Sequence, residues 1–350
     1  MIVSEKPYRI EVSYPKNSKE RYYLVKDVRV GDKKGKVRKY LCSEKTPTYA
    51  EIDDFRKKYG FELERKAAKK SGELGVLKYK TEFLTADLLS KLEEIKYLYK
   101  QFNTLLTVNE QTAYEEKFEV YYIQGTTSIE GNTFTREETR ELLYHGIVPP
   151  SKSLREVNEI QNFKKVKTYR DTYRGKVTIE FIKKLHSLIV QNIDDESAGM
   201  FRRTDDIGII GCDLQVAPSL LIEEELQRII DYYYQRVEDN YHPFEEAAMF
   251  HYFFEMIHPF ADGNGRVGRE IFNYMLNRSH YPKMLFLGDD RSLYLDGLKK
   301  ANEDNYSDLV THFANLIISQ RMDILLENLE NLIEERPQPP QRRLNDFFSI

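Results

Sequence analysis

The sequence predicts a mainly α-helical protein that carries a small antiparallel sheet near its N-terminus. From about Phe83 onwards apolar residues recur at helical spacing, beginning with Leu84, Leu88 and Leu92. Before that point, apolar and polar residues alternate as they do in half-buried strands. The length of 350 residues exceeds the roughly 100–200 residues of a usual domain, so we expect one large domain and a smaller module.

Residues 1–82 are predicted to form the smaller module, of the α+β type. Its expected strands are followed by a helix rich in Lys and Glu that begins near Thr48 and ends near Lys70. A turn is predicted over Gly31–Gly35, between the last two strands. The three predicted strands cover residues 8–14, 22–30 and 37–42.

Residues 83–335 are predicted to form the helical domain. Between two of its helices, residues 206–216 combine glycines with a short β-branched run and predict a hairpin. The Pro-rich string Arg336–Pro340 stops the last helix, so residues 336–350 are expected to form a flexible tail. The apolar stripes that predict the later helices cover 108–129, 136–144, 155–172, 178–192, 221–238, 244–257, 266–278 and 305–334.

Composition excludes several classes of protein. The net charge of −4 argues against a general nucleic-acid coating protein, and direct nucleic-acid binding is not expected. Cys42 and Cys212 lie far apart and have no neighbours at metal-ligand spacing, which indicates two reduced thiols. Because no apolar run approaches the ~18 residues that span a bilayer, we expect a soluble, cytoplasmic protein without a membrane partner.

The segment from His258 to Arg269 predicts a phosphate site. Gly263-Asn264-Gly265 can turn its backbone N–H groups towards one point, and a helix starting near Arg266 adds its dipole to this anion nest. Arg266 and Arg269 lie one turn apart and can grip further phosphates. Asp262 offers a hard oxygen ligand for a Mg²⁺ ion that bridges two phosphates.

His258 adds a catalytic group to this site. Imidazole titrates near neutrality, so it can take a proton from a hydroxyl that attacks phosphorus. Phe260 is expected to point into the core and fix the loop. A glycine loop alone is often a plain turn and a lone histidine is often structural. The combination of a base, an acid, a nest and two arginines within twelve residues is far more specific.

The segment resembles the signature of the Fic (filamentation induced by cAMP) family, His-x-Phe-x-Asp/Glu-Gly-Asn-Gly-Arg-x-x-Arg, and matches every specified position. The resemblance extends over about residues 85–320, through Ala247–Ile257, Leu185-His186, Gly199–Arg202 and Leu298–Asn302. It implies a Fic-type helical bundle with a short β-hairpin flap.

The family resemblance also implies a role for each matching residue. His258 would be the general base and Asp262 the Mg²⁺ ligand. The segment Gly263, Asn264, Gly265, Arg266, Val267, Gly268 and Arg269 would bind the phosphates of ATP, with Arg266 at the β-phosphate and Arg269 at the γ-phosphate. Tyr294 and Asn302 would line the adenosine pocket. The hairpin residues Ile207, Gly208, Ile209, Ile210 and Gly211 would form the flap that clamps a target protein by strand addition, although extra residues after Arg202 leave its register open.

The implied reaction is the transfer of AMP. A Ser, Thr or Tyr hydroxyl of a target protein would attack the α-phosphate in line, and pyrophosphate would leave. The direction and the nucleotide stay open, because a deAMPylase or a transferase of another NMP would keep the same site. A third alternative, of a different class, is a binding module that attaches to the sliding clamp PCNA and whose Fic site is catalytically inactive. The target is not identified by the sequence, and a homodimer is an open alternative.

Upstream, the string Thr126-Thr-Ser-Ile-Glu-Gly-Asn132 predicts the end of a helix that covers about 111–131, with Gly131 as its C-cap. Glu130 would then project from the last turn, where the helix dipole disfavours a carboxylate and favours a cationic partner. A solvated surface acid is the plain alternative. The string resembles the Fic inhibitory motif, Ser/Thr-x-x-x-Glu-Gly/Asn, by which Glu130 would pair with Arg269 and inhibit the enzyme from within the same chain.

The C-terminal tail resembles a PIP box, the motif that binds the sliding clamp PCNA. The matching residues are Gln341, Leu344, Phe347 and Phe348. The alternative is that the two phenylalanines fold back onto the enzyme. Near the other end, Lys and Arg gather around the predicted turn and could touch nucleic acid or a target, but a solvated face is the simpler interpretation: Lys26, Arg29, Lys33, Lys34, Lys36, Arg38 and Lys39.

Overall fold

The computed structural model describes residues 8–16, 19–43, 45–206, 216–288, 291–302 and 305–335. The chain divides into two compact units. The first comprises Met1–Tyr79, Thr85–Leu106 and Ile318–Ile350, and the second comprises Lys80–Leu84 and Thr107–Ile317. The first unit thus includes a helix, Ala86–Leu105, that lies beyond the predicted module boundary at residue 82.

The first unit contains an antiparallel sheet of strand order β1-β2-β3, which confirms the three predicted strands. They are β1 (Arg9–Ser13), β2 (Arg21–Val30) and β3 (Lys33–Ser43). The predicted turn over Gly31–Gly35 is too long, because β3 already begins at Lys33. A two-residue turn in which Gly31 adopts a φ of 59° matches the right-handed twist of the strands, so pairing continues up to Val30 and Lys33.

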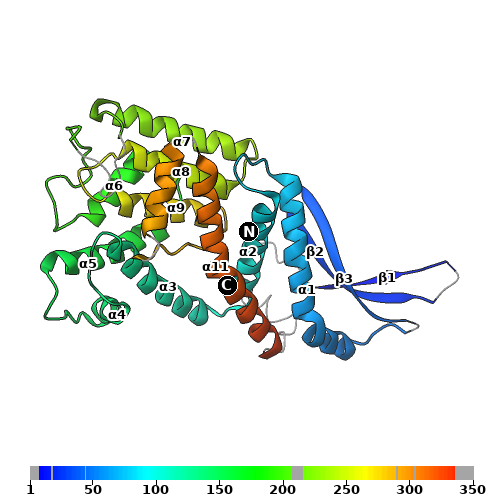
Figure 1. The fold of residues 1–350 in the computed structure, drawn as a ribbon. Helices are drawn as coiled ribbons and strands as arrows, with labels where there is room; N and C mark the ends of the chain where they lie inside the picture. The colour runs from blue at the N-terminus through cyan, green and yellow to red at the C-terminus, as the bar shows by residue number, and fades with distance from the viewer. Residues whose placement is uncertain are drawn as a thin grey trace. The chain divides into compact units, whose positions relative to one another are not determined.

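One face of this sheet packs on α1 (Tyr49–Lys78), and α2 (Ala86–Leu105) packs on α1 in turn (Figure 1). Leu24 and Leu63 are fully buried where sheet and helix meet. Helix α1 begins after Thr48 as predicted, but it continues to Lys78 instead of ending near Lys70. Gly72 lets α2 pack closely on this extension, because a side chain there would collide with the Ser90 backbone oxygen of α2 at 2.7 Å.

The second unit is helical. Its centre is formed by α8 and α9, with α6 and α7 around them (Figure 1). Phe254 of α8 and Phe272 of α9 are fully buried. The helices are α3 (Val108–Ser128), α4 (Arg136–His145), α5 (Leu154–Thr172), α6 (Ile179–Ile189), the 3₁₀ turn η1 (Ser219–Leu221), α7 (Ile222–Glu238), α8 (Pro243–Ile257), α9 (Asn264–Arg278) and α10 (Arg291–Asn302). Helix α11 (Tyr306–Glu335) begins in this unit and ends in the first.

Helix ends follow local chemistry. Thr135 and Glu138 form a capping box at the start of α4, and Thr107 and Ser153 open α3 and α5 in the same way. Helix α3 covers Val108–Ser128, which agrees with the apolar stripe over 108–129. The bounds of about 111–131 start too late and end too far along the chain, so Glu130 lies beyond the helix rather than in its last turn. Gly131 does adopt a positive φ, 97°, but as part of the turn that follows the cap at Ile129.

Several predictions fall outside the described residues: the flap hairpin Ile207–Gly211, Cys212 and the PIP-box-like tail. They stay predictions. Among the described helices, none is long and apolar enough to cross a membrane.

Candidate active site

The backbone of His258 ends α8 in a left-handed conformation, with φ 49°. Its N–H donates to the carbonyl of Phe254 at 2.9 Å. Its own carbonyl accepts from Nε of Arg202 at 2.8 Å, and a second guanidinium nitrogen of Arg202 donates to the Ile257 carbonyl at 3.2 Å. Arg202 is almost fully buried, so this cation holds a conformation that a non-glycine residue rarely adopts.

The loop after His258 is closed by two side chains. Phe260 is fully buried, as predicted, and its ring stacks on His186 of α6 with centroids 3.8 Å apart. The Asn264 side chain bonds the backbone of Phe260 twice, accepting from its N–H at 2.9 Å and donating to its carbonyl at 2.8 Å. His186 also contacts the carbonyl of Asp262 at 3.1 Å. The loop is therefore shaped before any ligand arrives.

Helix α9 begins at Asn264, two residues earlier than predicted, with Gly263 as its N-cap at a φ of 82°. The first N–H groups of a helix have no partner within the helix and, with its dipole, attract an anion. Because Gly265 has no side chain, one side of this helix end is open. A Cβ at position 265 would lie only 2.7 Å from Oε1 of Glu130. The Glu130 carboxylate thus lies against the N-terminal turn of α9.

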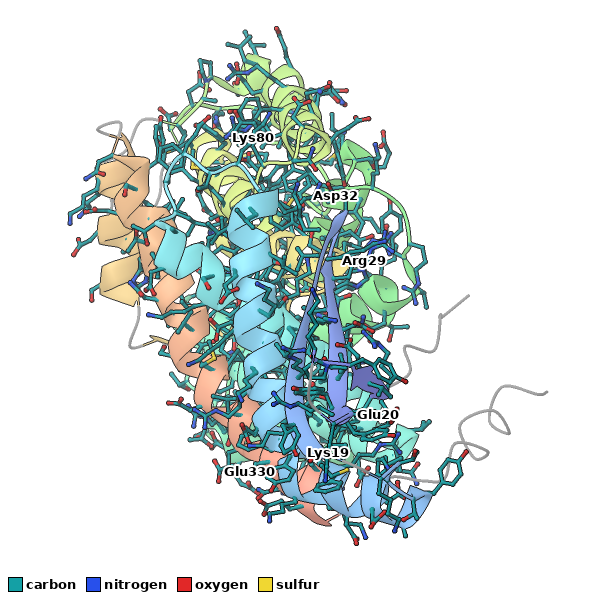
Figure 2. The ribbon with its side chains drawn as sticks, turned by 90° about the vertical axis from the view of Figure 1, so that its right-hand side faces the viewer. Lys19, Glu20, Arg29, Asp32, Lys80 and Glu330 are labelled. Carbon is teal, nitrogen blue, oxygen red and sulfur yellow. The ribbon has the colours of Figure 1, made fainter. Side chains whose placement is uncertain are left out.

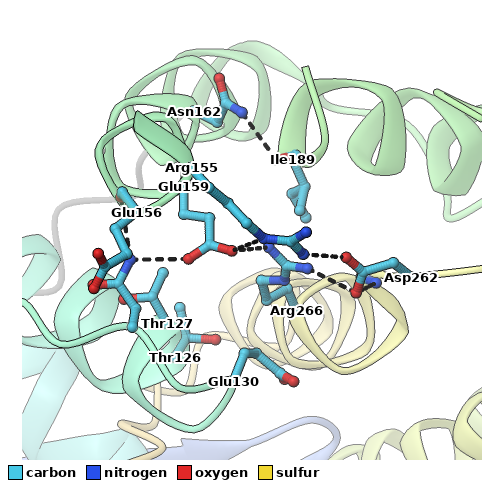
Figure 3. A network of polar contacts seen from close by, with 12 residues as sticks. Thr126, Thr127, Glu130, Arg155, Glu156, Glu159, Asn162, Ile189, Asp262 and Arg266 are labelled. Atoms are coloured by element: carbon cyan, nitrogen blue, oxygen red, sulfur yellow. Dashed lines mark hydrogen bonds and ion pairs between the residues drawn. The ribbon is translucent and has the colours of Figure 1, made fainter. Parts of the chain in front are cut away.

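Asp262 and Arg266 belong to a network of two acids and two arginines (Figure 3). Asp262 accepts from Arg155 at 2.7 Å and from Arg266 at 3.0 Å. Glu159 of α5 lies 3.3 Å from Arg155 and 3.4 Å from Arg266. Arg266 is almost fully buried, whereas the Asp262 side chain is 45% exposed. The more accessible acid can therefore exchange its partners for a ligand.

Arg269 is held by the end of α3 and the residues just after it. Its Nε donates to the Thr126 hydroxyl at 2.8 Å, and Nη2 donates to the Thr126 carbonyl at 3.0 Å. The same Nη2 forms the ion pair expected with Glu130, at 2.6 Å. Arg269 is 1% exposed and the Glu130 side chain is 32% exposed. The cation that the family resemblance assigns to the γ-phosphate thus already faces a carboxylate.

The protonation states follow from burial and charge. Burial, together with the positive charge of Arg202, lowers the pKa of His258 to about 4, so its imidazole is neutral at pH 7 and can accept a proton. Burial opposes the ionisation of Glu130, but Arg269 outweighs it and holds the pKa of the carboxyl below its usual range.

The structure thus brings together His258, Asp262, the start of α9, both arginines and Glu130. Tyr294 and Asn302 lie in α10, but their side chains fall outside the described residues. Sequence reasoning gave no role to Arg155, Glu159 and Arg202. One feature of the sequence could have pointed to Arg202, because the segment Gly199–Arg202 resembles its counterpart in the Fic family. Among the described residues, no three His, Cys, Asp or Glu side chains are placed to hold a metal ion.

Comparison with known proteins identifies this arrangement. The profile of the Fic/DOC family matches residues 176–276. Protein adenylyltransferase fic-1 of Caenorhabditis elegans is 31% identical over 198 residues, which cover 55% of this chain and 38% of that protein. Protein adenylyltransferase Fic of Drosophila ananassae is 30% identical over 264 residues, 72% of this chain and 52% of that protein. The chain therefore spans about half or less of these relatives.

Solved structures show the same fold. A structure of C. elegans Fic-1 matches with a TM-score of 0.62 and 23% identity, over 80% of this chain and 87% of that one. A Fic-domain signalling protein of Bacteroides thetaiotaomicron matches with a TM-score of 0.58 and 24% identity, over 69% and 98%. Profile, relatives and fold agree, and residues 176–276 are a Fic domain of the Fic/DOC family.

Proposed function

We propose that this protein transfers AMP from ATP to a hydroxyl side chain of a target protein and that Glu130 inhibits the transfer. The observation that carries the proposal is the neutral, buried His258 beside the start of α9, with Arg266 and Arg269 on the same helix. The two curated relatives named above are adenylyltransferases, which supports the same reaction class.

The residues divide the work of an in-line displacement. His258 takes the proton of the attacking hydroxyl, and the backbone that Arg202 fixes keeps its imidazole in place. The N–H groups at the start of α9 bind the phosphates, and Arg266 and Arg269 stabilise the charge that develops on pyrophosphate as it leaves.

The residues fit a Mg²⁺ ion that takes most of its ligands from the nucleotide. Mg²⁺ is usually held by one or two carboxylates together with phosphate oxygens and water. Asp262 supplies such a carboxylate next to the start of α9, and it is accessible. When bound, the ion would neutralise phosphate charge; Asp262 would hold it after releasing Arg155 and Arg266.

Inhibition rests on competition for one cation. The Glu130 carboxylate occupies the side of α9 that Gly265 leaves open and neutralises Arg269. A γ-phosphate would need the same guanidinium, so ATP either displaces Glu130 or binds without that contact. The competition predicts low activity in the wild-type chain.

The test is incubation with α-³²P-ATP and Mg²⁺ of wild type, Glu130→Gly, and Glu130→Gly with His258→Ala. We expect label on protein to rise at least about tenfold in the single variant, equivalent to about 1.4 kcal/mol of barrier, and to vanish in the double variant. Equal labelling of wild type and Glu130→Gly would refute inhibition by Glu130. Label that survives His258→Ala would refute the general base.

The alternatives give different outcomes in the same assay. A deAMPylase would release AMP from pre-labelled protein in the wild type, and that release would need Glu130. A transferase of another NMP would label protein from a different α-labelled triphosphate. A silent site would leave every variant unlabelled with every nucleotide.

A further inference from the structure

Positive charge is concentrated in the strands of the first unit. Residues 8–43 contain eleven Lys and Arg against four Asp and Glu, a net charge of +7. The whole chain carries −4, so the remainder carries −11. Such an asymmetry within one chain indicates a local surface for a polyanion that the overall charge conceals.

The strand register places most of these cations on one face. In the pairings Arg9–Val25–Arg38, Asp27–Lys36 and Arg29–Lys34, the partners point to the same side of the sheet. The opposite side packs on α1. The outer face, which we call the basic face, carries the exposed cations Arg9, Arg21, Arg29, Lys34, Lys36 and Arg38 and the acids Glu11 and Asp27.

The acids compensate only part of the basic face. Asp27 pairs with Arg9 at 2.8 Å, and Glu11 pairs with Lys36 at 2.6 Å. Arg29 donates to the Gly31 carbonyl, a neutral partner. Six cations against two acids leave the face strongly positive. In Figure 2 the strands lie beside α1, with Arg29 towards the β2–β3 turn.

The shape favours a duplex. Beyond Val25, β1 no longer pairs with β2, so β2 and β3 continue as a two-stranded ribbon that carries Arg29, Lys34 and Lys36. A two-stranded ribbon fits the major groove of B-DNA, about 12 Å wide. Outward residues two apart on a strand are separated by roughly 6.6 Å, close to two base-pair steps of about 3.4 Å.

The aromatic side chains argue against a single strand. Binding of single strands depends on open ring faces on which bases stack. The guanidinium of Arg38 covers the Tyr23 ring at 4.6 Å, and Tyr40 packs edge-on against Tyr23 at 5.8 Å. The Tyr23 face is therefore already occupied. Tyr40 is 48% exposed, so the basic face offers six cations but only limited ring surface for stacking.

We propose that the basic face binds double-stranded DNA through its phosphates, with the β2–β3 ribbon in the major groove. This function is separate from AMP transfer and does not depend on it. It gives the first unit a role in placing the Fic domain near DNA.

The experiment uses the 350-residue chain and a short fluorescein-labelled duplex of mixed sequence, and it measures fluorescence anisotropy from about 50 to 200 mM salt. The test variant is Lys34→Gln/Lys36→Gln/Arg38→Gln. The matched control, Lys57→Gln/Lys117→Gln/Lys184→Gln, removes the same charge at exposed positions outside the basic face. Equal melting temperatures verify that both are folded.

We expect the test variant to lose about tenfold or more in affinity and its log–log salt slope to become shallower by about 2 to 3. The control should stay within about twofold of wild type, because distant charges are screened. Equal affinities of the two variants, or no duplex binding by wild type, would overturn the proposal. So would tighter binding of the labelled single strand, or binding of phosphatidylserine vesicles without binding of duplex.

Discussion

Two sets of ion pairs join the α3 segment to α9, and they are built differently. Just beyond the C-terminal end of α3, one carboxylate, Glu130, meets one guanidinium, Arg269. Earlier in α3, Glu119 and Tyr122 enter a larger cluster centred on Arg170 of α5 and Glu270 of α9. Arg269 and Glu270 are neighbours in sequence, so a single turn of α9 takes part in both.

The larger cluster is closed, in the sense that its members are buried and bond one another. Arg170 donates to Glu119 at 2.6 Å and to Glu270 at 2.7 Å, and the Tyr122 hydroxyl donates to Glu270 at 2.8 Å. Lys283 adds a second cation on Glu119. The side chains of Glu119, Arg170 and Glu270 are at most 5% exposed.

The difference between the two sets of ion pairs indicates which contact can be exchanged for a ligand. In the closed cluster, loss of Arg170 leaves the buried Glu270 carboxylate without its ion-pair partner, which costs several kcal/mol. In the Glu130 pair, the carboxylate is 32% exposed and Arg269 keeps two bonds to Thr126 when it leaves. The cluster thus anchors α3 on α9, and under the proposed function the terminal pair is the one that the γ-phosphate would replace.

The largest effect is expected from Arg170→Met. Two buried carboxylates, Glu119 and Glu270, lose their shared cation, so the free energy of unfolding should fall by about 3–5 kcal/mol. Urea unfolding measures this loss. The control Arg140→Met removes an exposed arginine, 3.8 Å from Glu137, and should cost less than about 0.5 kcal/mol. Similar losses in both variants would contradict the anchoring role of the cluster.

The second-largest effect on the free energy of unfolding is expected from acidic pH. It should arise from buried histidines and not from either ion pair. Burial lowers the pKa of His186 and His258 to about 4 and that of His251 to about 3. The unfolded chain protonates these groups near pH 6.5 and the folded chain does not, so stability falls as pH drops below 6.5.

Between pH 7 and 5.5 this amounts to about 1 kcal/mol for each histidine. The pKa values of Glu119 and Glu130 are held below the usual range, despite burial, by Lys283 and Arg170 in one case and Arg269 in the other. Their contributions are lost only at lower pH. Urea unfolding at pH 7 and 5.5 should give the same drop in wild type and Glu130→Gln; no drop at all would contradict the neutral histidines.

The smallest effect is expected for Glu130→Gln, with a loss of about 1–2 kcal/mol in unfolding free energy, because Arg269 is buried but keeps its neutral partners. Its pair is partly solvated, and Thr126 still binds Arg269. Thermal unfolding without nucleotide measures the change. A loss comparable to that of Arg170→Met would mean that the terminal pair is structural, and the comparison between the two regions would fail.

The sequence alone determined the features that depend on neighbouring residues. Strand alternation and helix period predicted the main elements, because each arises from spacing within a few residues. The segment His258–Arg269 predicted a loop that leads into a helix for the same reason, and its phosphate site stays a prediction. The resemblance to the Fic inhibitory motif predicted that Glu130 pairs with Arg269. The errors arose where contacts between elements decide: the tight turn at Gly31 depends on pairing of β2 with β3, and the part of α1 beyond Lys70 packs on α2.

Only the tertiary structure decided which distant charges meet. Arg202 reaches the backbone of His258 across 56 positions, and Arg170 reaches Glu270 across 100. The outward face of the strands emerged only from the register of β2 and β3. A single Arg or Glu gives the same signal in the sequence whether its side chain is solvated or buried. Its partner is set by how helices pack, and burial in low dielectric then gives the contact its strength.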